Sequence, residues 1–221
     1  MLETPNNSEI QTHWRLKSWF PDLSEQTHAS LKIYFNELLK YNKTVNLISA
    51  KTVLNCDALH FADCINASNI VCKNINKNED LYDIGSGNGF PGIVYGILFP
   101  DQKVVLVEMD DRKCEFLRHA VLTLNLKNVR VENKKIENYP ADSIGQGFCR
   151  GFAPLPKTLM VLRKAVRLGG FVYHMKSAEW SMEVSQIPIQ LCSSWQPILV
   201  GEYKLPVGDM KLFVVKTDKI N

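Results

Sequence analysis

The segment Asp83-Ile84-Gly85-Ser86-Gly87-Asn88-Gly89-Phe90-Pro91-Gly92 decides the fold of this chain. It follows the short apolar run 81–84 and precedes a second apolar run, 93–99, with the character of a helix. Glycine is needed where the backbone approaches a ligand closely or takes a positive φ, so the segment is typical of a ligand-binding turn between a strand and a helix. Such ligands lie beyond the carboxyl ends of strands in open α/β sheets. We therefore predict an α/β, Rossmann-like fold with a cofactor at this loop.

From residue 80 onward, strand-like and helix-like segments alternate along the chain. This alternation predicts a mostly parallel, doubly wound sheet with right-handed crossovers and helices on both faces. A fourth strand is expected near 143–150, but its limits stay open because 143–148 contains more glycine than a central strand usually has. Residues 198–203 and 211–216, joined by a turn, predict an antiparallel C-terminal hairpin on this sheet. The remaining strands are expected at 103–108, 129–131 and 171–175, and helices at 111–124 and 154–168.

The N-terminal part of the chain is predicted to be helical. One helix is expected around 31–39, where apolar residues recur at helical spacing, and a second over 57–65. Trp14 and Trp19 are expected to attach the N-terminal segment to the core rather than to stack on bases. We expect residues 1–75 to form a helical cap region and residues 76–221 to form the cofactor-binding core.

Composition excludes several classes of protein. The 221 residues carry 26 Lys and Arg against 23 Asp and Glu, and this mildly basic balance does not by itself indicate nucleic acid. The six cysteines form no C-x-x-C pair and the five histidines are scattered, so we predict no metal. The chain has neither a run of eighteen apolar residues nor a signal-like N-terminus, so we expect a cytoplasmic protein without membrane association.

Two cofactors compete for the glycine loop. The pattern Gly87-x-Gly89-x-x-Gly92 matches the dinucleotide fingerprint, with Glu108 about twenty residues further on. A carboxylate at Asp83 would repel a pyrophosphate, whereas it suits the ammonium group of S-adenosylmethionine, and Glu108 can accept both ribose hydroxyls. The residues therefore favour S-adenosylmethionine, and a nicotinamide-dependent oxidoreductase is the alternative.

Four segments occur in this order along the chain: Tyr41-Asn42-Lys43-Thr44-Val45-Asn46-Leu47, His60-Phe61-Ala62-Asp63-Cys64, the glycine loop through Ile93, and Arg150-Gly151-Phe152-Ala153-Pro154-Leu155. Together they resemble the RsmG (GidB) family of bacterial 16S rRNA guanine-N7 methyltransferases. The similarity runs from about residue 30 to the end of the chain, and the upstream and Phe-Pro-Gly elements are its most specific parts. Cys149-Arg150-Gly151 departs from the Ser-Arg-Ala usual in the family.

The resemblance implies a class I methyltransferase sheet with an N-terminal helical cap. It also implies methylation of a guanine in the decoding-region loop of small-subunit rRNA, with 16S rRNA or the small subunit as partner. We expect the protein to be a monomer. The catalytic residues implied are Arg150, Asn46, His60 and Lys176. The cofactor-binding residues expected are Asp83, Gly85, Ser86, Gly87, Gly89, Phe90, Glu108, Met109, Ile136, Glu137 and Arg150.

The chemistry of this reaction agrees with the residues present. Guanine N7 carries a free lone pair, so no proton has to leave before attack, and catalysis rests on positioning and electrostatics. Arg150 suits the acceptor edge of guanine or a phosphate, and a structural ion pair is its other interpretation. Local basic residues, such as those at 112–118 and 163–167, are candidates for phosphate contacts. A non-catalytic RNA- or ribosome-binding module is the remaining alternative.

Overall fold

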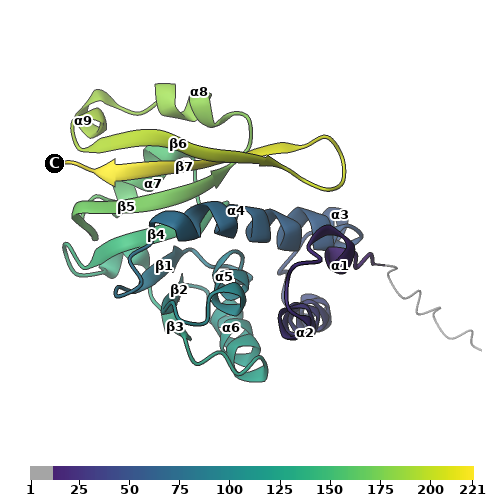
Figure 1. Cartoon of the computed structure of the whole chain (residues 1–221). Helices are drawn as coiled ribbons and strands as arrows, with labels where there is room; N and C mark the ends of the chain where they lie inside the picture. Colours follow the sequence, from purple (N-terminus) through teal and green to yellow (C-terminus); the bar gives the residue numbers. More distant parts are fainter. Residues whose placement is uncertain (1–11) are drawn as a thin grey trace, which may run out of the picture.

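The computed structural model describes residues 12–221, which form a seven-stranded sheet covered by helices on both faces (Figure 1). The strand order is β3-β2-β1-β4-β5-β7-β6. Neighbouring strands from β3 to β5 run parallel, while β7 pairs antiparallel with both β5 and β6. The predicted α/β sheet with its antiparallel C-terminal hairpin is confirmed. The strands are β1 (Leu81–Ile84), β2 (Val104–Glu108), β3 (Val129–Asn133), β4 (Ile144–Arg150), β5 (Val166–Lys176), β6 (Trp195–Lys204) and β7 (Lys211–Lys219).

Helices lie before the sheet in sequence and between its strands. Before β1 come α1 (Leu16–Trp19), α2 (Glu25–Asn42), α3 (Ala50–Val53), the π-helix η1 (Asp57–Ala62), α4 (Asp63–Val71) and the 3₁₀-helix η2 (Cys72–Asn74). Between the strands lie α5 (Gly92–Leu98), α6 (Asp111–Thr123), the 3₁₀-helix η3 (Ile136–Asn138), α7 (Leu155–Leu162), α8 (Trp180–Ser185) and α9 (Ile189–Cys192). Within residues 12–221, none of these helices combines the length and the apolarity that crossing a bilayer requires.

Strand order reverses between β1 and β4. The chain passes from β1 outward to β2 and β3, and then returns to the other side of β1 as β4 and β5. The connections after β1 and β4 therefore leave in opposite directions, which opens a crevice at the carboxyl ends of these two strands. The glycine loop follows β1 directly, so the fold places it at this crevice.

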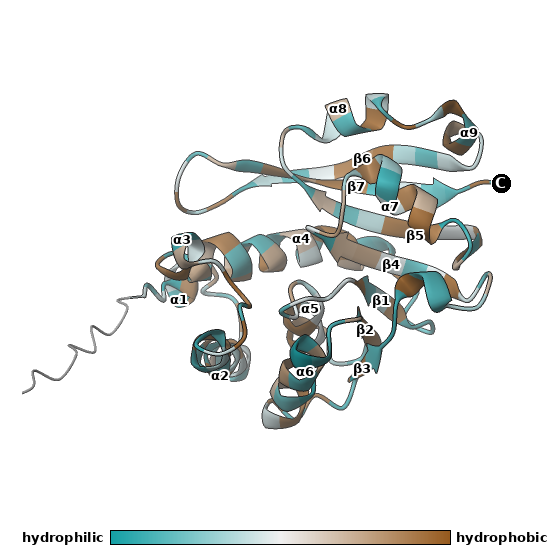
Figure 2. Cartoon of the chain, turned by 180° about the vertical axis from the view of Figure 1, so that it is seen from behind, coloured by the Kyte–Doolittle hydropathy of each residue, from teal (hydrophilic) through white to brown (hydrophobic). Residues whose placement is uncertain are grey.

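The two faces of the sheet bury separate sets of apolar side chains. On one face Phe35 of α2, Ile65 of α4 and Phe116 of α6 belong to a cluster that also contains strand residues. The other face buries Leu159 of α7 and Trp195 of β6 in a second cluster. Figure 2 shows the amphipathic character of α6, in which hydrophilic and hydrophobic residues alternate along the helix. Burying one large side chain contributes about 1.5–3 kcal/mol, so both faces are needed to hold the sheet.

The helical region before β1 shares its core with the sheet. The Trp14 ring lies 4.6 Å from the Phe35 ring and 5.1 Å from the Phe61 ring, as expected of an anchor for the N-terminal segment. Helix α2 begins at Ser24, whose hydroxyl accepts a hydrogen bond from the Thr27 N–H at 3.1 Å. Because the core is continuous across these elements, the division of the chain at residue 75 stays a prediction.

One sequence-based boundary was wrong, and two short helices were missed. The helix expected over 154–168 ends at Leu162, because Val166 is buried beside β4 and starts β5 early. The short helices α8 and α9 between β5 and β6 were missed, since segments of six and four residues carry little periodic signal. Pairing with β4, rather than local preference, sets the start of β5.

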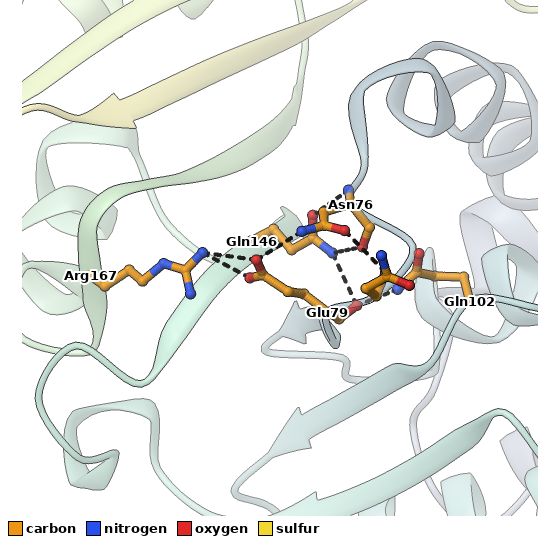
Figure 3. Close-up of polar contacts among 6 residues, drawn as sticks. Asn76, Glu79, Gln102, Gln146 and Arg167 are labelled. Carbon is orange, nitrogen blue, oxygen red and sulfur yellow. Dashed lines mark hydrogen bonds and ion pairs between the residues drawn. The ribbon is translucent and has the colours of Figure 1, made fainter.

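The glycine-rich stretch expected to weaken the fourth strand is a genuine part of β4. A Cβ added at Gly145 would meet the Glu79 carboxylate and the Arg167 guanidinium, and one at Gly147 would lie 3.0 Å from the Tyr82 carbonyl oxygen. Between them, the Gln146 amide donates to the Asn76 carbonyl oxygen at 2.8 Å and accepts from the Asn76 N–H at 2.9 Å (Figure 3). Close approach at the amino end of the sheet therefore explains the glycines.

Candidate functional site

The loop after β1 is held in place from two sides. The N–H groups of Gly85 and Ser86 donate to the Val107 carbonyl oxygen at 3.0 and 2.9 Å. From the helical cap, the Tyr34 hydroxyl donates to the Asn88 carbonyl oxygen. Asn88 in turn donates through Nδ2 to the Leu47 carbonyl oxygen at 2.8 Å. The loop is therefore anchored to both β2 and the cap.

Positive φ angles make glycine necessary within this loop. Gly85, Gly87 and Gly89 have φ of 71°, 56° and 91°. A Cβ at Gly89 would also lie 2.6 Å from Ile93 Cδ1 and 2.7 Å from the Tyr34 hydroxyl oxygen. The tight course of the backbone leaves room for a ligand above the loop.

Glu108 ends β2 beside the loop and orients its backbone. The Glu108 Oε2 accepts from the Gly87 N–H at 2.8 Å, while Oε1 accepts from the N–H groups of Met109 and Asp110 at 2.8 and 2.9 Å. A carboxylate with two oxygens has about four acceptor positions, so one remains for a ligand hydroxyl. This geometry fits a contact between Glu108 and one ribose hydroxyl, whereas the sequence predicted that Glu108 accepts both.

Asp83 lies beneath the loop. Its side chain is 1% exposed, and Oδ2 accepts from the Gly92 N–H at 3.0 Å. Among residues 12–221 no donor reaches Oδ1, and burial raises the pKa of this carboxyl to about 7. Asp83 does not line the neighbouring cavity, so its contact with a cofactor ammonium group stays a prediction.

A cavity of about 370 Å³, here called the loop cavity, opens above the loop and between the ends of β2 and β4. This volume lies within the range of small-molecule sites. Of the expected cofactor residues, only Asp83 and Gly89 do not line it. The residues that line it are Leu47, Gly85, Ser86, Gly87, Asn88, Phe90, Val107, Glu108, Met109, Lys113, Lys134, Lys135, Ile136, Glu137, Arg150, Gly151 and Phe152.

Several lining residues were not anticipated from the sequence. Gly151 and Phe152 follow Arg150 directly, and a Cβ at Gly85 would lie 2.5 Å from Phe152 Cδ2. Lys134 and Lys135 precede Ile136, which was expected near the adenine. These four residues are neighbours of motif residues in the sequence, and this proximity could have identified them as lining residues. Leu47 had no such signal, because only the folded cap brings it to the loop.

Arg150 is held by the cap at the end of β4. Its Nε donates to Asp63 Oδ2 at 2.9 Å, and its Nη2 donates to the Leu59 carbonyl oxygen at 2.9 Å and to His60 Nδ1 at 2.8 Å. Its Nη1 makes a long contact of 3.6 Å with Cys64 Sγ. The Tyr203 hydroxyl of β6 donates to the other Asp63 oxygen. The ion-pair interpretation of Arg150 therefore describes the structure, although Arg150 also lines the loop cavity.

His60 is a neutral partner of Arg150. An arginine offers only donors, so His60 Nδ1 accepts and its Nε2–H donates to the Thr52 hydroxyl at 3.1 Å. Burial, together with the charge of Arg150, lowers the pKa of His60 to about 3. The ring stacks on Phe90 with centroids 5.3 Å apart. At neutral pH His60 therefore positions Arg150 and Phe90 rather than moving a proton.

Lys176 and Asn46 lie outside the loop cavity. The Lys176 ammonium donates to the Ala153 carbonyl oxygen at 3.0 Å and pairs with Glu183 at 2.7 Å, which ties the segment after β4 to α8. Lys176 lines a second cavity, described below. Asn46 is exposed and lines neither cavity. Among residues 12–221, no group of three or more His, Cys, Asp or Glu side chains is placed to hold a metal ion.

Comparisons with known proteins agree with this site. A family model described as GidB, rRNA small subunit methyltransferase G, matches residues 27–197. The chain is 55% identical, over 94% of both proteins, to ribosomal RNA small subunit methyltransferase G 3 of Bdellovibrio bacteriovorus. It is 36% identical to the methyltransferase G of Paracoccus denitrificans, over 71% of this chain and 79% of that protein. The chain belongs to the rRNA small subunit methyltransferase G family.

Solved structures of other proteins share the fold at low identity. A tRNA (m1A58) methyltransferase, TrmI, of Aquifex aeolicus matches with a TM-score of 0.52 and 14% identity, over 72% of this chain and 69% of that one. The YcgJ protein of Bacillus subtilis matches with a TM-score of 0.54 and 12% identity, over 73% of this chain and all of that one. These similarities support the class I methyltransferase sheet.

Family membership confirms the functional prediction made from the glycine loop. The chain is an S-adenosylmethionine-dependent methyltransferase of small-subunit ribosomal RNA. The nicotinamide alternative is not favoured, and neither is the non-catalytic module. The residues of the loop cavity fit this cofactor, because the Gly87 backbone and the Glu108 carboxylate meet where a ribose is expected.

Proposed function

We propose that this enzyme methylates N7 of a guanine in the decoding-region loop of 16S rRNA, with the cofactor in the loop cavity. Two observations together support the proposal. The family model matches residues 27–197, and nearly all of the expected cofactor residues line the loop cavity. We further propose that the enzyme works as a cytoplasmic monomer without a metal ion.

The site contains what this reaction requires. S-adenosylmethionine supplies a methyl group on a sulfonium, and the guanine N7 lone pair forms the new C–N bond as the C–S bond breaks and its electrons remain on sulfur. No proton leaves, so a general base is unnecessary. His60, whose pKa is lowered to about 3, agrees with such chemistry. The protein contributes position and electrostatics, which together supply most of the rate in such reactions.

The experiment is a comparison of small-subunit rRNA from cells with and without the gene. We expect one 7-methylguanine in the decoding-region loop to disappear on deletion and to return with the wild-type gene. Return should fail with a Glu108→Ala gene whose protein is present at normal levels. An unchanged modification pattern on deletion contradicts the proposal.

A further inference from the structure

A second cavity of about 260 Å³ lies beside the loop cavity and is called here the hairpin cavity. It is formed by the ends of β4 and β5, the start of α4 and the β6–β7 hairpin, which extends past the end of β5 over α4 (Figure 1). Its apolar walls are Leu59, Met175, Leu205, Met210 and Leu212. We propose that the hairpin cavity receives the target guanine after it leaves the RNA stack, an inference that rests on the proposed function.

The position of the hairpin cavity suits a base that must reach the methyl group. Arg150 and Gly151 line both cavities and therefore form the wall between them. Gly151 has a φ of 64°, and no atom lies within 4 Å of where its Cβ would stand. No side chain therefore separates the two cavities at Gly151, so a ligand in one cavity can contact a ligand in the other at this residue. A purine in the hairpin cavity can direct N7 toward the loop cavity across Gly151.

The walls of the hairpin cavity suit a flat aromatic ring. Enzymes that act on a flipped base hold it between apolar or aromatic side chains and read its edges by hydrogen bonds. Leu212 and Met210 come from the hairpin, whereas Leu59 comes from the cap on the other side. Polar groups stand at the base of the cavity, where Arg150 and Asp63 are paired. This division of apolar and polar lining is the one a nucleobase requires.

A hydrogen-bond count for Arg150 identifies the contact that selects guanine. The guanidinium has five N–H groups. Nε uses its one N–H on Asp63, Nη2 uses both on Leu59 and His60, and Nη1 has one long contact with Cys64. No acceptor among residues 12–221 takes the remaining Nη1 hydrogen. Arginine pairs with the O6 and N7 edge of guanine, and one N–H given to O6 leaves N7 free to attack.

The test uses tryptophan substitutions that fill the hairpin cavity. Met210 is 49% exposed at its rim, so Met210→Trp preserves the fold, and Leu212→Trp fills the cavity more deeply. Ile198→Trp is the matched control, because Ile198 is 41% exposed on the same hairpin and lines neither cavity. Each variant is assayed on small ribosomal subunits from cells that lack the gene. S-adenosylhomocysteine binding is measured by calorimetry.

We expect Met210→Trp and Leu212→Trp to lower kcat/KM by about 100-fold, as for a misplaced reactant, with unchanged S-adenosylhomocysteine binding. The Ile198→Trp control should keep the wild-type rate. An RNA fragment with the target guanine intact and 2-aminopurine as its neighbour should brighten with the wild-type protein and S-adenosylhomocysteine, because the guanine leaves the stack, but not with the two filled variants. Wild-type rates in both filled variants would overturn the proposal. A wild-type enzyme that forms no 7-methylguanine would instead overturn the proposed function.

Discussion

The Arg150 guanidinium donates through Nε to the Asp63 carboxylate at 2.9 Å, and this pair joins the end of β4 to the start of α4. The two residues belong to sequence motifs that lie 87 residues apart, each of which suggested a functional role. Asp63 also accepts a hydrogen bond from the Tyr203 hydroxyl, so residues of the cap, the core and the hairpin all contact one carboxylate. The pair therefore sets the wall between the two cavities.

Removal of Asp63 leaves the half-buried Arg150 guanidinium without the buried carboxylate that is its counter-ion. We expect Asp63→Ala to lower the free energy of unfolding by about 3–5 kcal/mol, the usual cost of breaking a buried pair. Asp209→Ala is the control, because its pair with Lys204 is exposed and contributes less than about 1 kcal/mol. Urea unfolding at neutral pH measures both. Equal effects of the two substitutions would show that Arg150 does not depend on Asp63.

Glu108 tests the assignment of the cofactor. Hydrogen bonds to a charged group contribute about 1.5–3 kcal/mol, so we expect Glu108→Gln to weaken S-adenosylhomocysteine binding by about 10- to 100-fold. Asp101→Asn, an exposed change before the opposite end of β2, should leave the affinity unchanged. Calorimetry with S-adenosylhomocysteine, and with NADH as competitor, measures the difference. Displacement by NADH would contradict the cofactor assignment.

Gly89 and Gly208 separate backbone strain from steric conflict. Both have positive φ, and a side chain in this region costs about 1–2 kcal/mol. At Gly208 nothing lies within 4 Å of the added Cβ, whereas at Gly89 it would lie 2.6 Å from Ile93 Cδ1. We expect Gly208→Ala to lose only that stability and to bind cofactor normally. Gly89→Ala should lose more stability and also bind S-adenosylhomocysteine more weakly. Denaturant unfolding measures the stability of both variants, and calorimetry measures their binding. Identical behaviour of the two would contradict the loop geometry.

Asp83 should make stability depend on pH. Burial raises the pKa of Asp83 from 3.8 to about 7, so between these values the folded protein holds a proton that the unfolded chain releases. Its contribution to stability is therefore complete below pH 4 and is lost as pH rises through 7. His60 and His174, with pKa values lowered to about 3, contribute the opposite slope.

Subtracting the wild-type curve from that of Asp83→Asn isolates the carboxyl group. We expect the difference in the free energy of unfolding to shift in favour of the variant from about pH 4 to pH 7 and then to become constant. Urea unfolding across this range measures it. A flat difference would mean that Asp83 titrates near its ordinary value.

Three lysines around the loop cavity should contribute to RNA affinity. Lys113, Lys134 and Lys135 line the cavity, which lies at the carboxyl edge of the sheet. Each phosphate contact adds about 0.7–0.9 to the slope of log K against log salt, so we expect Lys113→Gln and Lys135→Gln to reduce the slope by about that amount each. Lys103→Gln, before the amino end of β2, is the control. Filter binding of the target RNA at several salt concentrations measures the slopes, and unchanged slopes would place the RNA elsewhere.

The basic residues of 163–167, which were also candidates for phosphate contacts, lie away from the site in the folded protein. Helix α7 starts after β4 and ends at Leu162, at the amino edge of the sheet. Arg167 there pairs with Glu79 at 2.9 Å (Figure 3). Equal runs of positive charge in the sequence thus have unequal access to the site.

The α/β class, the cofactor loop and the family could all be predicted from the amino-acid sequence. These properties follow from local patterns. The patterns are a run of glycines that permits positive φ angles, alternating apolar segments, and Glu108 at the end of the next strand. The glycine pattern predicted Gly85 and Gly87 as cofactor residues, and the family resemblance predicted Ile136; all three line the loop cavity.

The contacts between residues that are distant in the sequence could be identified only from the tertiary structure. It paired Arg150 with Asp63 and Lys176 with Glu183, left Asn46 exposed, and turned Asp83 beneath the loop. It also closed the hairpin cavity with residues that have no motif of their own. The physical reason is that an ion pair or a cavity wall depends on which surfaces pack together, and spacing along one chain does not contain that information.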